Sequence, residues 1–256
     1  MVLLGSELLA EYRDKCEKRI FQQEISVDRS MNVLDIGCGT GRWELFVSNR
    51  CRQIVGFDFS QALLNVAAQK MEEIGANNVT LICSTLGDFD TDEKYDLAII
   101  SSVLLYVPDS EVAKLLQKLN TIMIPEGKVF NLEFTGIRES FRGGHGTDSE
   151  YSEYQMRTTE QFVKLFYKAG FELDKEGYAM PPFIFTSLLC RLLVPNRFRE
   201  TRLMKTMLRI GLRLQYSIID PVLNRIPRIY KMLLFFKRAY PVHHRYYIYT
   251  KRHIEP

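Results

Sequence analysis

The sequence predicts an α/β protein with a mostly parallel sheet, and three observations support this prediction. A buried strand at 32–36 runs into a glycine-rich turn that opens a helix. A second apolar strand at 53–58 ends in a carboxylate, Asp58. Further strand patterns then alternate with helix patterns along the chain, which is the order that parallel βαβ units require.

The individual elements follow from hydrophobic periodicity and from helix boundary signals. An amphipathic helix is expected over 7–25, where it would cover the sheet or an adjoining cleft. Ser60 is a natural N-cap for the helix that follows the second strand. The other expected helices are 41–50, 61–74, 109–123 and 158–169, and the expected strands are 32–36, 53–58, 79–83, 95–101, 127–134, 171–179 and 244–250.

The glycine-rich turn is the strongest indication of a binding site. Glycines at 37, 39 and 41 allow the backbone to approach a ligand closely, and the helix beyond them offers N–H donors to an anion. Arg42 stands where a dinucleotide fingerprint has its last glycine, which disfavours a pyrophosphate. Asp35 would repel a pyrophosphate but suit a cation, and Asp58 could accept both hydroxyls of a ribose. These residues favour an adenosine ligand that carries a sulfonium and an amino-acid tail.

The stretches VLDIGCGTG at 33–41 and GFDFS at 56–60 together resemble the class I S-adenosylmethionine-dependent methyltransferase family. The order of elements agrees through about residue 180. The resemblance implies a methyltransferase enzyme with a Rossmann-like, seven-stranded, mostly parallel sheet, helices on both faces and an antiparallel last strand. It also implies that S-adenosylmethionine is the cofactor and that its binding residues are Asp35, Gly37, Gly39, Thr40, Gly41, Asp58, Phe59, Thr85, Leu86 and Ser101.

The loop after the third strand departs from the family pattern. The family commonly places an aspartate there to bind the adenine amino group, whereas this chain has Thr85 followed by Leu86. Asp88 could substitute for that aspartate, although a helix-capping or solvated role is the preferred interpretation. Adenine contacts in this loop are therefore expected to be weaker than in the family.

Three residues are candidates for the acceptor side of the site. Methyl transfer is an in-line displacement, so alignment provides most of the acceleration and only a protonated acceptor needs a base. The candidates are His145 in the segment FRGGHGT, Tyr106 after the fourth strand and Glu133 at the end of the fifth. Their structural alternatives are a loop histidine, a packed aromatic and a charged strand terminus. Metal dependence is not implied.

Charge is distributed unevenly along the chain. Residues 1–182 have a net charge of −9, whereas 183–240 have a net charge of +10. Within the basic stretch, 202–214 reads as an amphipathic helix with arginines and lysine opposite leucine, methionine and isoleucine. The expected regions are a cofactor-binding core with an N-terminal capping helix at 1–182, a helical insertion at 183–240, and the final strand of the core at 241–256.

The insertion leaves several partners open. It could pack on the core as an acceptor lid, pair two copies as a homodimer, or contact an anionic membrane surface through 197–240. Nucleic acid is a weaker alternative, because no RNA-binding module accompanies the basic stripe and no Asn/Asp-Pro-Pro-Tyr/Phe tetrad is present. The insertion therefore bears on which acceptor the protein uses.

Composition limits the class of protein. With 256 residues and 46% hydrophobic residues, the chain can bury a full-sized core. Five cysteines without a C-x-x-C pair indicate reduced thiols, and no leader or eighteen-residue apolar run is recognised. We expect a cytoplasmic enzyme, with a peripheral place on the inner face of a membrane as the second option.

The expected reaction is methyl transfer from S-adenosylmethionine to a small-molecule, glycan or lipid-linked acceptor. Two alternatives stay open at this point. One is an RNA methyltransferase recruited by the basic insertion, and the other is a protein that binds S-adenosylmethionine without catalysis.

Overall fold

The structure is a computed structural model that describes residues 6–136, 141–144, 153–180, 206, 210, 211, 214, 216, 217 and 242–252. The large sheet consists of β1 (Asn32–Ile36), β2 (Gln53–Asp58), β3 (Val79–Cys83), β4 (Tyr95–Ser101), β5 (Met123–Gly136), β8 (Phe171–Tyr178) and β9 (Val242–Lys251). The helices are α1 (Ser6–Glu24), α2 (Glu44–Val47), α3 (Gln61–Glu73), α4 (Asp109–Ile122) and α5 (Thr159–Lys168), with a 3₁₀ turn η1 (Leu104–Tyr106). A separate hairpin joins β6 (Phe141–Gly144) to β7 (Glu153–Met156).

The strand order confirms the predicted sheet. The seven strands run in the order β3-β2-β1-β4-β5-β9-β8, and β1 lies between β2 and β4 in parallel register. Strand β9 is antiparallel to both β5 and β8. The order reverses at β1 and β4, and in open α/β sheets ligands bind outside the carboxyl ends of the strands at such a point.

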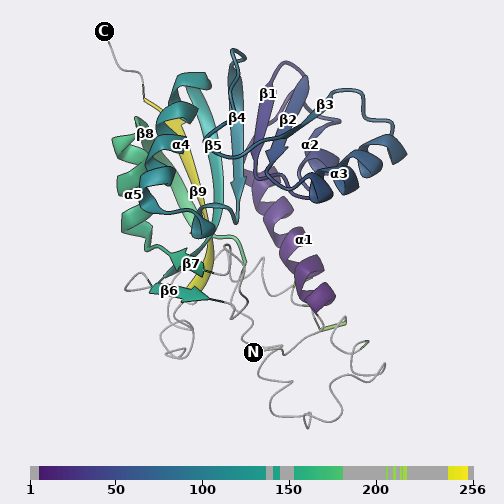
Figure 1. Cartoon of the computed structure of the whole chain (residues 1–256). Coiled ribbons are helices and arrows are strands. Elements are labelled where there is room, and N and C mark those ends of the chain that lie inside the picture. Colours follow the sequence, from purple (N-terminus) through teal and green to yellow (C-terminus); the bar gives the residue numbers. More distant parts are fainter. Residues whose placement is uncertain are drawn as a thin grey trace.

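Two apolar layers cover the two faces of the sheet (Figure 1). Alternation along the strands directs Leu34, Ile36 and Ile100 toward α4 and α5, and it directs Val33, Ile54 and Ile99 toward α1 and α2. This alternation also assigns polar residues to a face. Asp35 and Gly56 share the α1 and α2 face, and Glu133 shares the α4 and α5 face with Val129.

Some elements differ from the predicted ranges. The helix predicted at 41–50 is reduced to α2, because Gly41 has a φ of +75° and the backbone turns until Trp43. Strand β5 extends beyond 127–134 in both directions, because it pairs with β9 as far as Gly136. The hairpin of β6 and β7 was not predicted, because no alternating apolar pattern marks it.

Several predictions concern residues outside the described ones. His145 and most of the insertion at 183–240 belong to this group, so the three-region division stays a prediction. Among the described residues, no helix has the length and apolar character needed to cross a membrane.

Candidate functional site

The glycine turn between β1 and α2 has a backbone that other residues rarely adopt. Gly37, Gly39 and Gly41 have φ angles of +70°, +55° and +75°. A Cβ on Gly37 would lie 2.5 Å from Val103 Cγ2, so a side chain there would collide with the segment after β4. The carbonyl oxygen of Thr40 accepts a hydrogen bond of 2.9 Å from Lys70 Nζ. The turn therefore presents bare main chain at the carboxyl end of β1.

Asp58 connects this turn to the end of β2. Its Oδ2 accepts a hydrogen bond of 3.0 Å from the Gly39 N–H, and its Oδ1 accepts one of 2.9 Å from the Ser60 N–H. The residue is buried, whereas its neighbour Phe59 is 54% exposed. Asp58 thus holds two backbone segments in place with an anionic group, and Phe59 offers an aromatic ring beside it.

Asp35 lies beneath the same turn and is buried. Burial raises the pKa of its carboxyl group, and Arg42 opposes that rise. Glu44, the first residue of α2, is also buried, and burial followed by the charge of Asp35 raises its pKa as well. The structure thus joins Asp35 to a second carboxyl group that the sequence analysis did not select.

The loop after β3 is closed by its own side chains. Thr85 Oγ1 donates a hydrogen bond of 2.7 Å to Asp88 Oδ2, and the Asp88 N–H donates one of 3.2 Å to Thr85 Oγ1. Leu86 is partly buried and packs on the core that contains the stacked rings of Phe57 and Phe89. No described helix begins at Asp88, so these bonds close a turn and do not cap a helix, and Asp88 is exposed as the solvated alternative predicted.

The end of β4 carries backbone strain. Ser102 has a φ of +59°, a conformation that costs a residue with a side chain of order 1–3 kcal/mol. Its N–H donates a hydrogen bond of 2.8 Å to the carbonyl oxygen of Leu132 on β5. The preceding residue, Ser101, accepts a hydrogen bond of 2.9 Å on Oγ from Arg42 Nη2. This turn brings the segment after β4 against the glycine turn.

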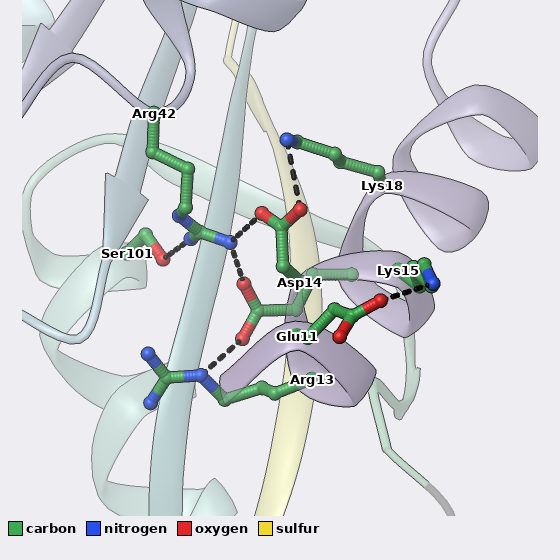
Figure 2. A network of polar contacts seen from close by, with 8 residues as sticks. Glu11, Arg13, Asp14, Lys15, Lys18, Arg42 and Ser101 are labelled. Carbon is green, nitrogen blue, oxygen red and sulfur yellow. Dashed lines mark hydrogen bonds and ion pairs between the residues drawn. The ribbon is translucent and has the colours of Figure 1, made fainter. Parts of the chain in front are cut away.

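Arg42 joins three parts of the molecule (Figure 2). Besides Ser101, its guanidinium binds Asp14 at 3.0 Å and also Glu17, both on α1. Glu17 is buried, and although burial raises its pKa, Arg42 and Arg13 oppose that rise. The predicted N-terminal helix is therefore anchored to the glycine turn by ion pairs.

His244 on β9 lies on the other side of Glu17. Its Nε2 is 3.4 Å from Glu17 Oε1, and its ring packs on Phe134 with centroids 4.6 Å apart. Burial, together with Arg13 and Arg42, lowers the pKa of His244 to about 3. The imidazole is therefore neutral near pH 7.

The turn η1, after β4, is held at both ends by buried ionisable side chains, Glu133 and Arg157. Glu133 Oε1 accepts hydrogen bonds from the N–H groups of Val103 and Leu104, at 3.0 and 2.7 Å. Arg157 is 0% exposed and donates to the carbonyl oxygens of Leu104 and Val107, the latter at 2.6 Å. Its Nε donates a further hydrogen bond of 2.8 Å to the Asp109 carboxylate.

The predicted acceptor residues occupy different environments. Tyr106 lies in η1 and is 44% exposed, so its ring is accessible at the edge of the sheet. Glu133 is buried, and burial raises its pKa to about 8. Its Oε2 has no hydrogen-bond partner within the part of the chain that the structure describes. His145 lies outside the described residues, so its part in the site stays a prediction.

Sequence reasoning missed three residues of this site. Arg42 was noted only because it breaks the dinucleotide pattern, and Arg157 precedes a helix cap without any distinguishing pattern. Glu44 had a usable signal, because it is a lone carboxylate within the apolar run WELFV.

Comparisons with known proteins agree with this geometry. Residues 33–127 match the family model described as a methyltransferase domain. A demethylmenaquinone methyltransferase from Oceanobacillus iheyensis is 26% identical over 132 residues, which cover 50% of this chain and 55% of that protein. One from Listeria monocytogenes is 27% identical over 173 residues, which cover 57% of this chain and 71% of that protein. The chain thus spans little more than half of the first relative.

Solved structures support the fold. The 1,6-didemethyltoxoflavin-N1-methyltransferase of Burkholderia thailandensis, solved with bound 1,6-didemethyltoxoflavin and S-adenosylhomocysteine, has a TM-score of 0.61 with this chain at 12% sequence identity. The similarity covers 94% of this chain and 79% of that one. At this identity the likeness establishes the architecture alone.

Proposed function

Because this chain belongs to the class I S-adenosylmethionine-dependent methyltransferases, we propose that it methylates a small-molecule acceptor bound at the carboxyl ends of β4 and β5. The observation that supports this most directly is the pair of hydrogen bonds that the Asp58 carboxylate accepts from the N–H groups of Gly39 and Ser60. These bonds hold the carboxylate of Asp58 beside the glycine turn, at the place where the strand order of the sheet reverses. That arrangement suits an adenosyl ligand with an amino-acid tail.

The residues fit S-adenosylmethionine. Asp58 would hold the ribose, the turn at 37–41 would surround the methionine part, and exposed Phe59 would lie beside the adenine. The unpartnered Asp35 Oδ2 is a buried acceptor of the kind that a cationic group requires. When bound, the cofactor supplies a methyl group activated on a sulfonium. Thr85 and Leu86 would contribute weaker adenine contacts, since Thr85 is engaged with Asp88.

Positioning of the acceptor would depend on η1. Glu133 and Arg157 hold its N–H and carbonyl groups, which fixes the segment after Ser101 and presents Tyr106 outward. Glu133 therefore acts as a positioning residue in this proposal, because its Oε1 already serves two backbone donors. Tyr106 is the residue proposed to face the acceptor, and His145 stays a candidate base.

Among small molecules, we favour an acceptor with an apolar or lipid-linked part. Ile210 and Leu214 lie four residues apart on helical backbone and are 54% and 52% exposed, so both present apolar surface outward. This surface lies in the basic segment proposed to contact an anionic membrane. Relatives named for demethylmenaquinone, at 26% and 27% identity, agree with this choice.

The test is label transfer from methyl-labelled S-adenosylmethionine into three fractions: small-molecule extracts, membrane lipid extracts and RNA. We expect label in the small-molecule or lipid fraction, with the product identified by a mass gain of one methylene. Asp58→Ala serves as the variant with weakened cofactor binding, and Glu72→Ala on α3 as the control at an exposed acid.

The fractions separate the alternatives. Label confined to RNA would overturn the small-molecule proposal. Cofactor binding by calorimetry without label in any fraction would instead favour a protein that binds the cofactor without catalysis.

A further inference from the structure

Three acidic side chains crowd the region beneath the glycine turn. Asp35, Glu44 and Asp58 are 1%, 0% and 7% exposed. Asp58 is satisfied by two backbone N–H groups. In contrast, Asp35 Oδ2 and both carboxyl oxygens of Glu44 have no hydrogen-bond partner among the described residues. An ionised carboxylate buried without a partner is strongly unfavourable, so this pair needs a chemical explanation.

Glu44 reaches from α2 to the strand position beside Asp35. Asp35 and Gly56 are partners in the parallel register of β1 and β2. A Cβ built on Gly56 would lie 2.1 Å from Glu44 Oε1 and 3.0 Å from Cys38 Cβ. The carboxyl group of Glu44 thus occupies the space left by the missing side chain of Gly56. After burial, the charge of Asp35 is the next cause of the raised pKa of Glu44.

The surroundings of the pair are acidic overall. The other groups that act on it are Asp58 at the end of β2 and Arg42 at the start of α2. Arg42 already binds Asp14, Glu17 and Ser101. Cys38 stays a neutral thiol, because burial and the neighbouring Glu44, Asp35 and Asp58 raise its pKa. Two neighbouring buried carboxyl groups cannot both ionise at low cost, since the negative charge of one raises the pKa of the other.

We propose that Asp35 and Glu44 share one proton while the site holds no cofactor, and that binding of the positively charged methyl donor releases this proton to the solvent. The shared proton satisfies the otherwise unpartnered oxygens in the free protein. The cation supplies the missing counter-charge in the complex. This inference rests on the proposed function and adds a residue, Glu44, that distinguishes donor from product by charge.

The chemistry of donor and product makes the distinction measurable. S-adenosylmethionine carries one positive charge more than S-adenosylhomocysteine, because its sulfonium becomes a neutral thioether after methyl transfer. Only the donor therefore compensates two ionised carboxyl groups. The affinity for the donor should rise with pH, by up to about tenfold per pH unit, through the range in which the pair titrates. The affinity for the product should change little.

Calorimetry on the full chain tests this inference. Titrations are run from about pH 6 to about pH 8.5, each in two buffers of different ionisation enthalpy, so that the number of released protons is measured directly. The ligands are S-adenosylmethionine, S-adenosylhomocysteine and an analogue whose sulfonium is replaced by a protonated amine. We expect proton release with both cationic ligands and much less with S-adenosylhomocysteine.

Glu44→Gln removes the shared proton while keeping the side-chain size. We expect this variant to bind S-adenosylmethionine without excess proton release and without the rise of affinity with pH. Glu72→Gln, on the exposed face of α3, is the matched control and should behave as the wild type. If Glu44→Gln does not fold, the comparison of the three ligands on the wild type still decides the question.

The outcomes distinguish this inference from the proposed function. Equal proton release with the donor and with S-adenosylhomocysteine overturns the proton-sharing pair but leaves the methyltransferase assignment intact. Undiminished release in folded Glu44→Gln does the same. Failure of all three ligands to bind the folded wild type overturns both.

Discussion

The glycine turn with Asp58 forms the cofactor side of the proposed site, and η1 forms its acceptor side. The two are held in place in different ways. On the cofactor side, Asp58 binds Gly39 and Ser60, which are 19 and 2 residues away in sequence. On the acceptor side, η1 is held by Glu133 and Arg157, which lie 29 and 53 residues from Leu104. The first arrangement is built within one βαβ unit, and the second is assembled from distant strands and loops.

This difference also separates the roles of buried charge. Around η1, the buried guanidinium of Arg157 is compensated by backbone carbonyls and Asp109, and it keeps a loop in one conformation. Beneath the glycine turn, Asp35 and Glu44 have unpartnered oxygens, which is an arrangement suited to a charged ligand. Compensated buried charge thus indicates positioning, whereas uncompensated buried charge indicates binding.

The largest expected effect is on the acceptor side. Arg157→Met removes the donors for Leu104 and Val107 and leaves their carbonyl oxygens buried. We expect the free energy of unfolding to fall by about 3–6 kcal/mol, because two carbonyl oxygens each lose a hydrogen bond from a charged donor, worth about 1.5–3 kcal/mol. Urea denaturation measures this loss. Asp109→Asn is the control, because Asp109 is 58% exposed and its pairing should be worth under about 1 kcal/mol; equal losses in both variants would contradict a special role for Arg157.

The next effect is on the cofactor side. Asp58→Ala removes an anionic acceptor, and a hydrogen bond to a charged group is worth about 1.5–3 kcal/mol. We expect the dissociation constant for S-adenosylmethionine to rise by roughly 10- to 150-fold in calorimetry. Glu72→Ala, at an exposed acid on α3, should leave it nearly unchanged. An unaltered constant in Asp58→Ala would show that the ribose is held elsewhere.

The next prediction concerns the pH dependence of the free energy of unfolding that Glu133 contributes. The pKa of Glu133 is raised to about 8 by burial, from an ordinary value of 4.5. Between these two values the folded protein retains a proton that the unfolded chain has released, so the contribution of Glu133 to stability falls as pH rises. We expect Glu133→Gln to remove a slope of up to about 1.4 kcal/mol per pH unit, measured by urea denaturation between about pH 5 and about pH 8. Parallel stability curves for wild type and variant would refute this.

The smallest expected effect is on stability and concerns the ion pairs of Arg42 with α1, since Arg42 also binds Ser101 at the end of β4. Asp14 pairs with Arg42 and Lys18 and is 29% exposed on its side chain. We expect Asp14→Asn to lower the free energy of unfolding by at most about 1 kcal/mol, and the loss should shrink at high salt. Glu11→Gln, in the exposed pair with Lys15, is the control and should cost less. A loss for Asp14→Asn that does not depend on salt would argue against a screened ion pair.

On the cofactor side, the backbone of the turn and the place of Asp58 could be predicted from sequence, whereas Arg42 and Glu44 were missed. The turn at 37–41 and the acid at the end of β2 lie in one contiguous stretch, and the φ angles of its glycines follow from the absence of a Cβ. Ser60 was recognised as an N-cap for the same local reason, and its side chain accepts a hydrogen bond of 3.4 Å from the Leu63 N–H.

The acceptor side could not be predicted in this way. Tyr106 and Glu133 were selected from their places at strand ends, but nothing in the sequence indicated that Glu133 would bind the backbone of η1. Arg157 was missed, because its three acceptors come from a segment about fifty residues earlier. The role of His145 and the arrangement of the insertion at 183–240 stay predictions.

The sequence by itself determined the α/β class, the seven-stranded sheet and the glycine turn with its acid, because periodicity, helix caps and positive φ angles depend on near neighbours. Only the tertiary structure decided that Arg42 would anchor α1, that Glu44 would lie beside Asp35, and that Arg157 and Glu133 would hold η1. Those arrangements depend on burial and on charges brought together by strand order. The free energy of a charged group is set by such surroundings, which no local pattern encodes.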